Sequence, residues 1–330
     1  MKKVRVEAST KKDRTSEIFG NPMSKKVIRK AQKSKQKNQK KYGDDSKVNY
    51  QCIIRDNSCI GGPLGVKNVV VTRKEGKGSF DEEKGVIVGN IRMGFGHYRI
   101  SMAIASAAHA LGYTPYWMDL NSYPETTCTK LISAQNELYS LGSRISQKSK
   151  LFNKFVWEPV NYEGFRQLSY NAADQKNAEL MAPVYHSVPK DIPVIATHVW
   201  PAQAAVHAGM KHVVNAIPDN WPMALHYAQG SLHTVQTHYA YQGYRIGNGM
   251  MKDKVVQAMP PQDLMYTGHY IDHELAANIE KDCETRLSRL KNGEAMRFLL
   301  TVGGAGAQME IFGEVLHYLI PYVIAGKAVV

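Results

Sequence analysis

Residues 85–98 read GVIVGNIRMGFGHY, a short apolar run that leads into a glycine-rich loop. The apolar residues 86–88 lie between two glycines, a pattern typical of a strand buried in a parallel sheet. We expect an alanine-rich helix over about 98–111, with Gly112 as its left-handed C-terminal cap. Residues 116–119 then predict a second strand. Because such a strand–helix–strand unit needs a right-handed crossover, its two strands should be parallel.

The same alternation continues along the chain, which predicts an α/β fold with a Rossmann-like domain over residues 61–265. Further strands are expected over 193–196, 213–217 and 232–236, with helices over 201–208, 239–244 and 274–290.

A second element of the same kind comes near the end of the sequence. A strand over 298–302 leads into the glycines Gly303, Gly304 and Gly306, and a helix is expected over 308–319. Residues 327–330 resemble the start of another strand. One and a half strands do not make a domain. We therefore expect residues 266–330 to be a linker and the beginning of a second Rossmann-like domain, in a chain that is truncated.

Positive charge is concentrated at the N-terminus. Residues 1–50 hold 16 Lys and Arg against 5 Asp and Glu, whereas residues 51–330 hold 26 against 24. With few apolar residues over 25–41, the composition predicts a disordered basic tail over residues 1–60. Removal of residues 1–45 should then leave the melting temperature unchanged. The tail is interpreted as a solvated extension or as a segment with loose attraction to anionic lipid or RNA, and no specific nucleic-acid partner is expected.

Other patterns limit the class of protein. The charged N-terminus is followed by no apolar segment of the signal-peptide kind, and no stretch reaches the length of a membrane span. The four cysteines are scattered, which suits a reducing cytoplasm. Seven histidines fall between His186 and His238, but their spacings match no metal-site pattern, so no metal is expected.

Glycine-rich loops that open a helix favour anions, because the backbone can approach closely and the helix presents free N–H groups. Packing alone can also demand glycine, and that interpretation stays open for each loop. A dinucleotide fingerprint requires a third glycine, but Arg99 stands at that position after Gly94 and Gly96. NAD binding is therefore not favoured, even though Asp119 ends the second strand where a ribose-binding carboxylate would lie.

Several motifs in matching order resemble a family of GT-B glycosyltransferases. The motifs are Gly94-Phe95-Gly96-His97, Leu111-Gly112, Asp119-Leu120, Ala196-Thr197-His198, Pro218-Asp219, Tyr266-Thr267-Gly268 and 302–307. The family includes the monogalactosyldiacylglycerol synthases and the bacterial transferase that adds N-acetylglucosamine to the peptidoglycan lipid precursor. The chain departs from the family pattern at Phe95 and at Pro218, where the family tends to carry Thr.

The resemblance implies roles for individual residues. Gly94, Gly96, Tyr98 and His198 would contact the acceptor or a phosphate, and Gly303, Gly304 and Gly306 would bind the donor. His97, at a helix N-terminus, would be the general base, with Asp219 as a second catalytic residue. The alternatives are that His97 only caps the loop and that Asp219 only bonds its own turn.

The function implied is transfer of a hexose from a nucleotide sugar to a lipid or lipid-linked acceptor, without a cofactor. Residues 139–170 interleave aromatic and basic side chains, which suits either contact with a membrane surface or an ordinary helix docked on the core. The protein is expected in the cytoplasm, peripheral on the inner face of the membrane, and inactive as a fragment. Alternatives are a nucleotide-sugar epimerase of the same fold or a non-catalytic binding protein.

Overall fold

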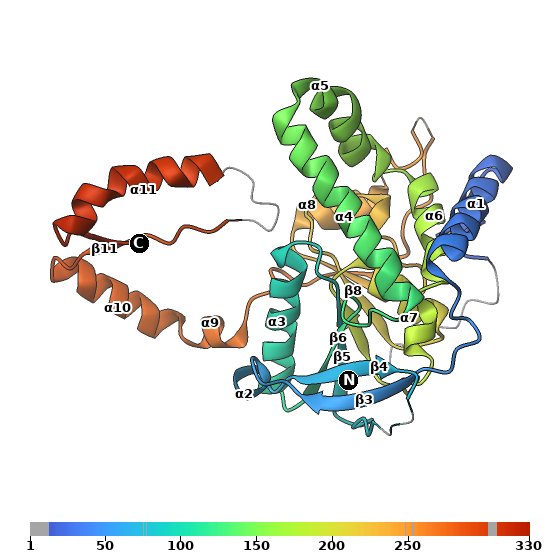
Figure 1. Ribbon diagram of the computed structural model, residues 1–330, viewed down its shortest axis with the longest axis horizontal. Coiled ribbons are helices and arrows are strands. Elements are labelled where there is room, and N and C mark those ends of the chain that lie inside the picture. The colour runs from blue at the N-terminus through green and yellow to red at the C-terminus, as the bar shows by residue number, and fades with distance from the viewer. Residues whose placement is uncertain (1–12, 75, 77, 248, 253, 303–308) are drawn as a thin grey trace.

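The computed structural model describes residues 13–330 except 75, 77, 248, 253 and 303–308 (Figure 1). Among these residues, eight strands form the central sheet in the order β10-β9-β8-β7-β5-β6-β4-β3. Only the edge pair β3/β4 is antiparallel, and all the other neighbours are parallel. The strands are β3 (Gln51–Asp56), β4 (Lys67–Thr72), β5 (Gly85–Asn90), β6 (Thr114–Asp119), β7 (Val194–Ala196), β8 (Val213–Ala216), β9 (Leu232–Val235) and β10 (Leu264–Tyr266).

Helices cover both faces of this sheet. On β5, the side chain of Val88 joins a core cluster with Ala105 of α3, whereas Ile87 joins a larger cluster with Leu131 of α4 and Ala202 of α7. Successive strand residues point to opposite faces, so α3 lies on one face and α4 and α7 lie on the other (Figure 1). These helices and their neighbours are α2 (Gly61–Leu64), α3 (Phe95–Ala110), α4 (Thr127–Lys148), α6 (Leu168–Ala178), α7 (Val199–His207) and α8 (His238–Ile246).

The predicted α/β class and the parallel arrangement of the first two strands are confirmed. β5 is fully buried between β6 and β7, and both neighbours are parallel to it. Gly112 has the left-handed φ of +81° that was predicted at the end of α3. Helix α3 begins at Phe95 rather than near residue 98, so that Gly96 lies in its first turn.

The prediction of a disordered tail is wrong for residues 13–60. Helix α1 (Lys25–Tyr42) follows the short hairpin of β1 (Glu17–Ile18) and β2 (Asn21–Pro22), and it packs along α6. Ala31 is buried in that contact, and Lys35 Nζ lies 2.6 Å from Glu179 Oε2. Ile18 and Phe19 belong to the core cluster that includes α6 and α8. Residues 1–12 lie outside the described part of the chain.

The C-terminal segment forms a separate strand–helix–strand unit to one side of the sheet (Figure 1). β11 (Met296–Arg297) pairs in parallel with β12 (Ala328–Val329), and α11 (Met309–Ile324) connects them. The strand predicted over 298–302 is thus displaced to 296–297. Helices α9 (His273–Ala277) and α10 (Ile279–Lys291) lead to this unit. An ion pair between Arg99 and Asp272 attaches the start of α9 to α3.

Residues 139–170 form a projection at the end of α4. After α4 come α5 (Lys150–Phe152) and the π-helical segments η1 (Asn153–Trp157) and η2 (Val160–Gly164). The apolar side chains of Leu151 and Phe155 are exposed here. Among the described residues, no helix is long and apolar enough to cross a membrane.

Candidate active site

The glycine-rich loop lies at the carboxyl end of β5, where the order of the sheet reverses. From β5 the chain proceeds through α3 to β6 on one side, whereas β7 and α7 lie on the other side of β5. The loops after β5 and β7 therefore diverge, and ligands of open α/β sheets bind in the crevice at such a switch point. These two loops carry His97 and His198.

Both glycines of this loop face open space. Gly94 is the N-cap of α3 with a φ of +72°, a conformation that favours glycine. Among the described residues, no atom lies within 4 Å of the position that a Cβ would take on Gly94 or Gly96. Close packing therefore does not explain either glycine. The first N–H groups of α3 are left accessible to an anion.

His97 is held in one orientation by the end of β7. Its Nδ1 lies 2.6 Å from the carbonyl oxygen of Thr197, and a carbonyl can only accept, so Nδ1 carries the proton. Burial lowers the pKa of His97 despite this hydrogen bond and the charge of Asp219. The ring is thus neutral at pH 7, and its Nε2 keeps a lone pair that can take a proton. Ser101 bonds both the His97 carbonyl (2.9 Å) and the Thr197 hydroxyl (2.8 Å), which fixes the first turn of α3 against β7.

His198, which was predicted to contact the acceptor or a phosphate, is buried beside His97. It is 4% exposed and is the N-cap of α7, where its Nδ1 accepts the Trp200 N–H at 3.1 Å. Its ring lies edge-on to His97, with the centroids 4.8 Å apart. Burial, with the charges of neighbouring histidines, holds the pKa of His198 well below its usual range. It therefore provides a neutral wall behind His97.

Asp219 follows β8, the strand next to β7, and it lies close enough to His97 for each to influence the pKa of the other. Its Oδ2 is 3.0 Å from Nε2 of His226, a residue at the end of the 3-10 turn η4 (Ala224–His226). Burial alone would raise the pKa of Asp219, but its close contact with His226, together with the nearby His97, lowers it. The carboxylate is therefore ionised at neutral pH and partnered by a side chain that is 2% exposed.

His226 was not predicted from the sequence. It is one of seven histidines in that region, and nothing in its spacing distinguishes it from the others. The structure brings it together with His97, His198 and Asp219 in a four-residue cluster, in which His226 contacts Asp219 and His97 packs on His198. Among the described residues, no group of three or more His, Cys, Asp or Glu side chains is arranged to hold a metal ion.

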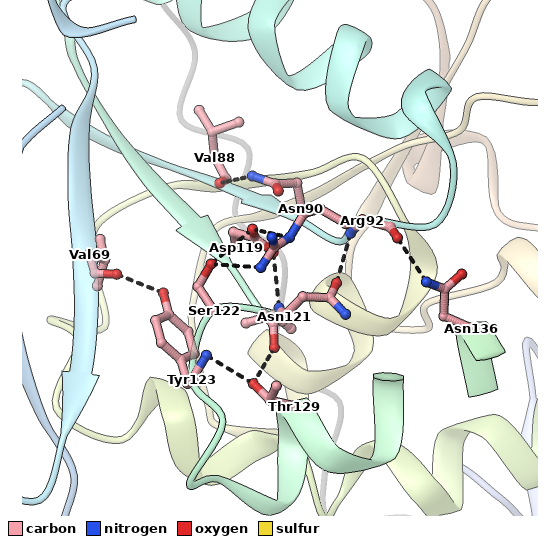
Figure 2. A network of polar contacts seen from close by, with 11 residues as sticks. Val69, Val88, Asn90, Arg92, Asp119, Asn121, Ser122, Tyr123, Thr129 and Asn136 are labelled. Atoms are coloured by element: carbon pink, nitrogen blue, oxygen red, sulfur yellow. Dashed lines mark hydrogen bonds and ion pairs between the residues drawn. The ribbon is translucent and has the colours of Figure 1, made fainter. Parts of the chain in front are cut away.

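A polar network braces the loop between β5 and α3 (Figure 2). Arg92 Nε lies 2.9 Å from Asp119 Oδ2, and the Arg92 backbone N–H donates to Asn121 Oδ1 at 2.7 Å. The Arg92 carbonyl accepts from Asn136 of α4 at 3.1 Å. Asp119 also accepts from Ser122 Oγ at 2.9 Å. Asp119 is thus occupied in positioning the loop.

Tyr98 and the three predicted donor-binding glycines complete the list of predicted site residues. The ring of Tyr98 packs edge-on against Trp117, with the centroids 4.9 Å apart, beside the core cluster under α3. Tyr98 therefore helps to anchor α3 on the sheet, and its contact with the acceptor or a phosphate stays a prediction. The predicted donor-binding residues Gly303, Gly304 and Gly306 lie outside the described residues.

The model of a domain of unknown function, DUF6937, matches residues 17–246, more than half of the chain. The chain belongs to the DUF6937 family. The matched part of this DUF6937 protein contains the described sheet up to β9, together with α1 and every member of the four-residue cluster. A second domain of unknown function, DUF6938, matches residues 259–330, which include α9 to β12. No curated protein and no solved structure matches the chain.

Proposed function

We propose that this protein is a GT-B-type glycosyltransferase that moves a hexose from a nucleotide sugar to a lipid or lipid-linked acceptor. The observation that carries the proposal is the tautomer and position of His97. A neutral imidazole with a free Nε2 stands at the N-terminus of a 16-residue helix, at the switch point of a parallel sheet.

Glycosyl transfer requires a base for the acceptor hydroxyl and groups that stabilise negative charge, and these features would supply both. Nε2 of His97 takes the proton of an acceptor hydroxyl as its oxygen forms a bond to the anomeric carbon. The bond from that carbon to the diphosphate breaks, and the nucleoside diphosphate leaves with the electron pair. The N–H groups behind Gly94 stabilise negative charge near the loop, and ionised Asp219 stabilises the imidazolium that forms.

The projection over residues 139–170 supports the lipid part of the proposal. It exposes Leu151 and Phe155 next to basic residues such as Lys148, Lys150 and Lys154. Apolar side chains beside cations suit the boundary of a membrane with anionic headgroups. The proposed location is accordingly the inner face of the cytoplasmic membrane, with the protein bound peripherally.

The test is a transfer assay with the full-length protein, radiolabelled nucleotide hexoses and a lipid extract as acceptor. His97→Ala should lower turnover by about 10²-fold or more with little change in donor affinity, because a general base acts in the transition state. His212→Ala is the matched control, since His212 is exposed at the opposite, amino-terminal end of β8. Gly96→Val should instead weaken binding of the nucleotide sugar, because its side chain would fill the open space above the loop.

Two results would count against the proposal. If His97→Ala keeps wild-type turnover, the imidazole only caps the loop, and Asp219 becomes the candidate base. If no label enters lipid although nucleotide sugar is bound or isomerised, the glycosyltransferase assignment fails in favour of a binding protein or an epimerase.

A further inference from the structure

Three aromatic side chains, here called the aromatic row, lie together near Asp219: Tyr162, Trp221 and Tyr239. The ring centroids of Tyr162 and Trp221 are 5.4 Å apart with planes 31° apart, and those of Trp221 and Tyr239 are 6.2 Å apart with planes 34° apart. Tyr162 is 52% exposed, Trp221 36% and Tyr239 58%. Exposed large aromatic residues that gather from separate segments mark a binding surface more often than scattered single ones do.

The row lies at the ligand-binding edge of the sheet. Trp221 comes two residues after Asp219 in the turn that follows β8, and Tyr239 is in the first turn of α8, which follows β9. Tyr162 comes from η2, on the projection formed by residues 139–170. The row therefore connects the projection with the carboxyl ends of two neighbouring strands, beside the proposed catalytic groups.

The turn that carries Trp221 is held before any ligand arrives. Gln236 Nε2 donates to the Pro218 carbonyl at 2.7 Å. Pro222 packs so closely on α8 that a Cβ on Gly243 would lie 2.1 Å from its Cγ. The Arg166 guanidinium carbon lies 5.6 Å from the centre of the Trp221 ring. A Trp221 ring that is held in this way loses little conformational entropy on binding, which favours affinity.

The chemistry of the row favours a sugar ring. A pyranose has a flat face of C–H bonds with partial positive charge, which complements the negative face of an aromatic ring. Its hydroxyl groups at the rim can bond to tyrosine hydroxyls and to a guanidinium, which are the polar groups present here. A hydrocarbon chain needs aliphatic walls and gains nothing from these polar groups.

We propose that the aromatic row binds a pyranose unit of the acceptor, so that the acceptor hydroxyl belongs to a sugar-bearing molecule. This inference rests on the proposed function, because only glycosyl transfer would make the bound sugar an acceptor. The existence of a pyranose site at the row can be tested without any turnover.

The experiment is saturation-transfer NMR on the full chain with methyl glucoside, methyl galactoside and methyl N-acetylglucosaminide as separate probes. At least one probe should receive saturation at its ring C–H protons. Trp221→Ala and Tyr239→Ala should each weaken the apparent affinity about tenfold, because an aromatic stacking partner contributes on that order. Tyr239→Phe keeps the ring and should retain most of the binding. Tyr318→Ala removes an exposed tyrosine of α11 and should change nothing.

Three outcomes would overturn the pyranose site. They are no saturation of any pyranoside, equal binding by the wild type and both alanine variants, and a Trp221-dependent site that prefers uridine or an alkyl detergent monomer. The transfer assay separates this failure from that of the proposed function. If transfer depends on His97 but not on Trp221, only the pyranose site is wrong. If the row binds sugar but no transfer occurs, only the proposed function is wrong.

Discussion

Asp174 lies behind the candidate site, and its burial makes its charge state a sensitive test of the structure. The residue is on α6, it is 5% exposed, and its Oδ2 accepts the indole N–H of Trp200 at 3.2 Å. Trp200 packs in turn against His198, the wall behind His97. Burial raises the pKa of Asp174 from 3.8 to about 7, although the hydrogen bond from Trp200 opposes the shift.

The sign of the effect follows from proton binding. Between pH 4 and pH 7 the folded protein keeps the Asp174 proton, whereas the unfolded chain has lost it. Stability from this group is therefore lost as pH rises through that window. A difference of about three pKa units corresponds to about 4 kcal/mol in the free energy of unfolding. That is a large share of the roughly 5–15 kcal/mol that is typical of a folded protein.

The assay is urea unfolding of the wild type and of Asp174→Asn from pH 4 to pH 8. Asparagine keeps an oxygen for Trp200 but does not titrate, so the stability of the variant relative to the wild type should rise by about 4 kcal/mol across the window. Other groups cancel in this difference. The buried His207, whose pKa falls to about 4, makes stability rise with pH, and it does so equally in both proteins. A difference curve that stays flat from pH 4 to pH 8 would refute the burial of an ionisable Asp174.

Three further outcomes test other parts of the structure. Deletion of residues 1–45 should lower the melting temperature by about 5 °C or more in a thermal scan, because it removes α1 and part of a core cluster. Gly243→Ala should cost about 1–3 kcal/mol in urea unfolding, because the new methyl group would collide with Pro222. Ellman's reagent should modify two thiols rapidly, those of Cys59 and Cys283, and the other two cysteines only after unfolding.

The parallel sheet could be predicted because its signal is local. Short apolar runs that alternate with helical segments predicted strands β5 to β9 within one or two residues. The left-handed cap at Gly112 was predicted for the same reason, since one residue determines that conformation. The apolar run over 298–302 was predicted as a strand, but the structure places β11 just before it, at Met296–Arg297.

The fold of the N-terminal segment could not be predicted from composition. Helix α1 has a sequence dominated by Lys and Gln, and among its described residues only Ala31 is fully buried. Val27 and Ile28 pack partly buried against a core cluster, and polar contacts with α6 add to this, such as the bond of 3.0 Å from Asn38 Nδ2 to Asn177 Oδ1. Composition counts such residues as evidence for disorder. Partners that lie about 140 positions away in the sequence decide the outcome.

Of the four residues clustered at the candidate site, three were predicted to bind or react. His97 and Asp219 lie where such roles are feasible, whereas His198 is buried behind them. His226 was missed because its relation to Asp219 depends on the path of the turn between them, not on a spacing rule. A motif therefore identified the loop, but the partners of each side chain had to come from the structure.

Strand order explains why residues so far apart in the sequence meet at one place. His97 follows β5, His198 follows β7 and Asp219 follows β8, and these three strands are neighbours in the sheet. The sequence predicts each strand but not the reversal that places β7 beside β5 after β6 has joined the other side. All three loops emerge from carboxyl ends, so a reversal at this point necessarily gathers them around one crevice. The same geometry adds Trp221 from the turn that holds Asp219, and Tyr239 from the segment after β9, the next strand along the edge. The proposed catalytic groups and the aromatic row are thus successive parts of one edge, and substitutions in either should affect the same bound acceptor.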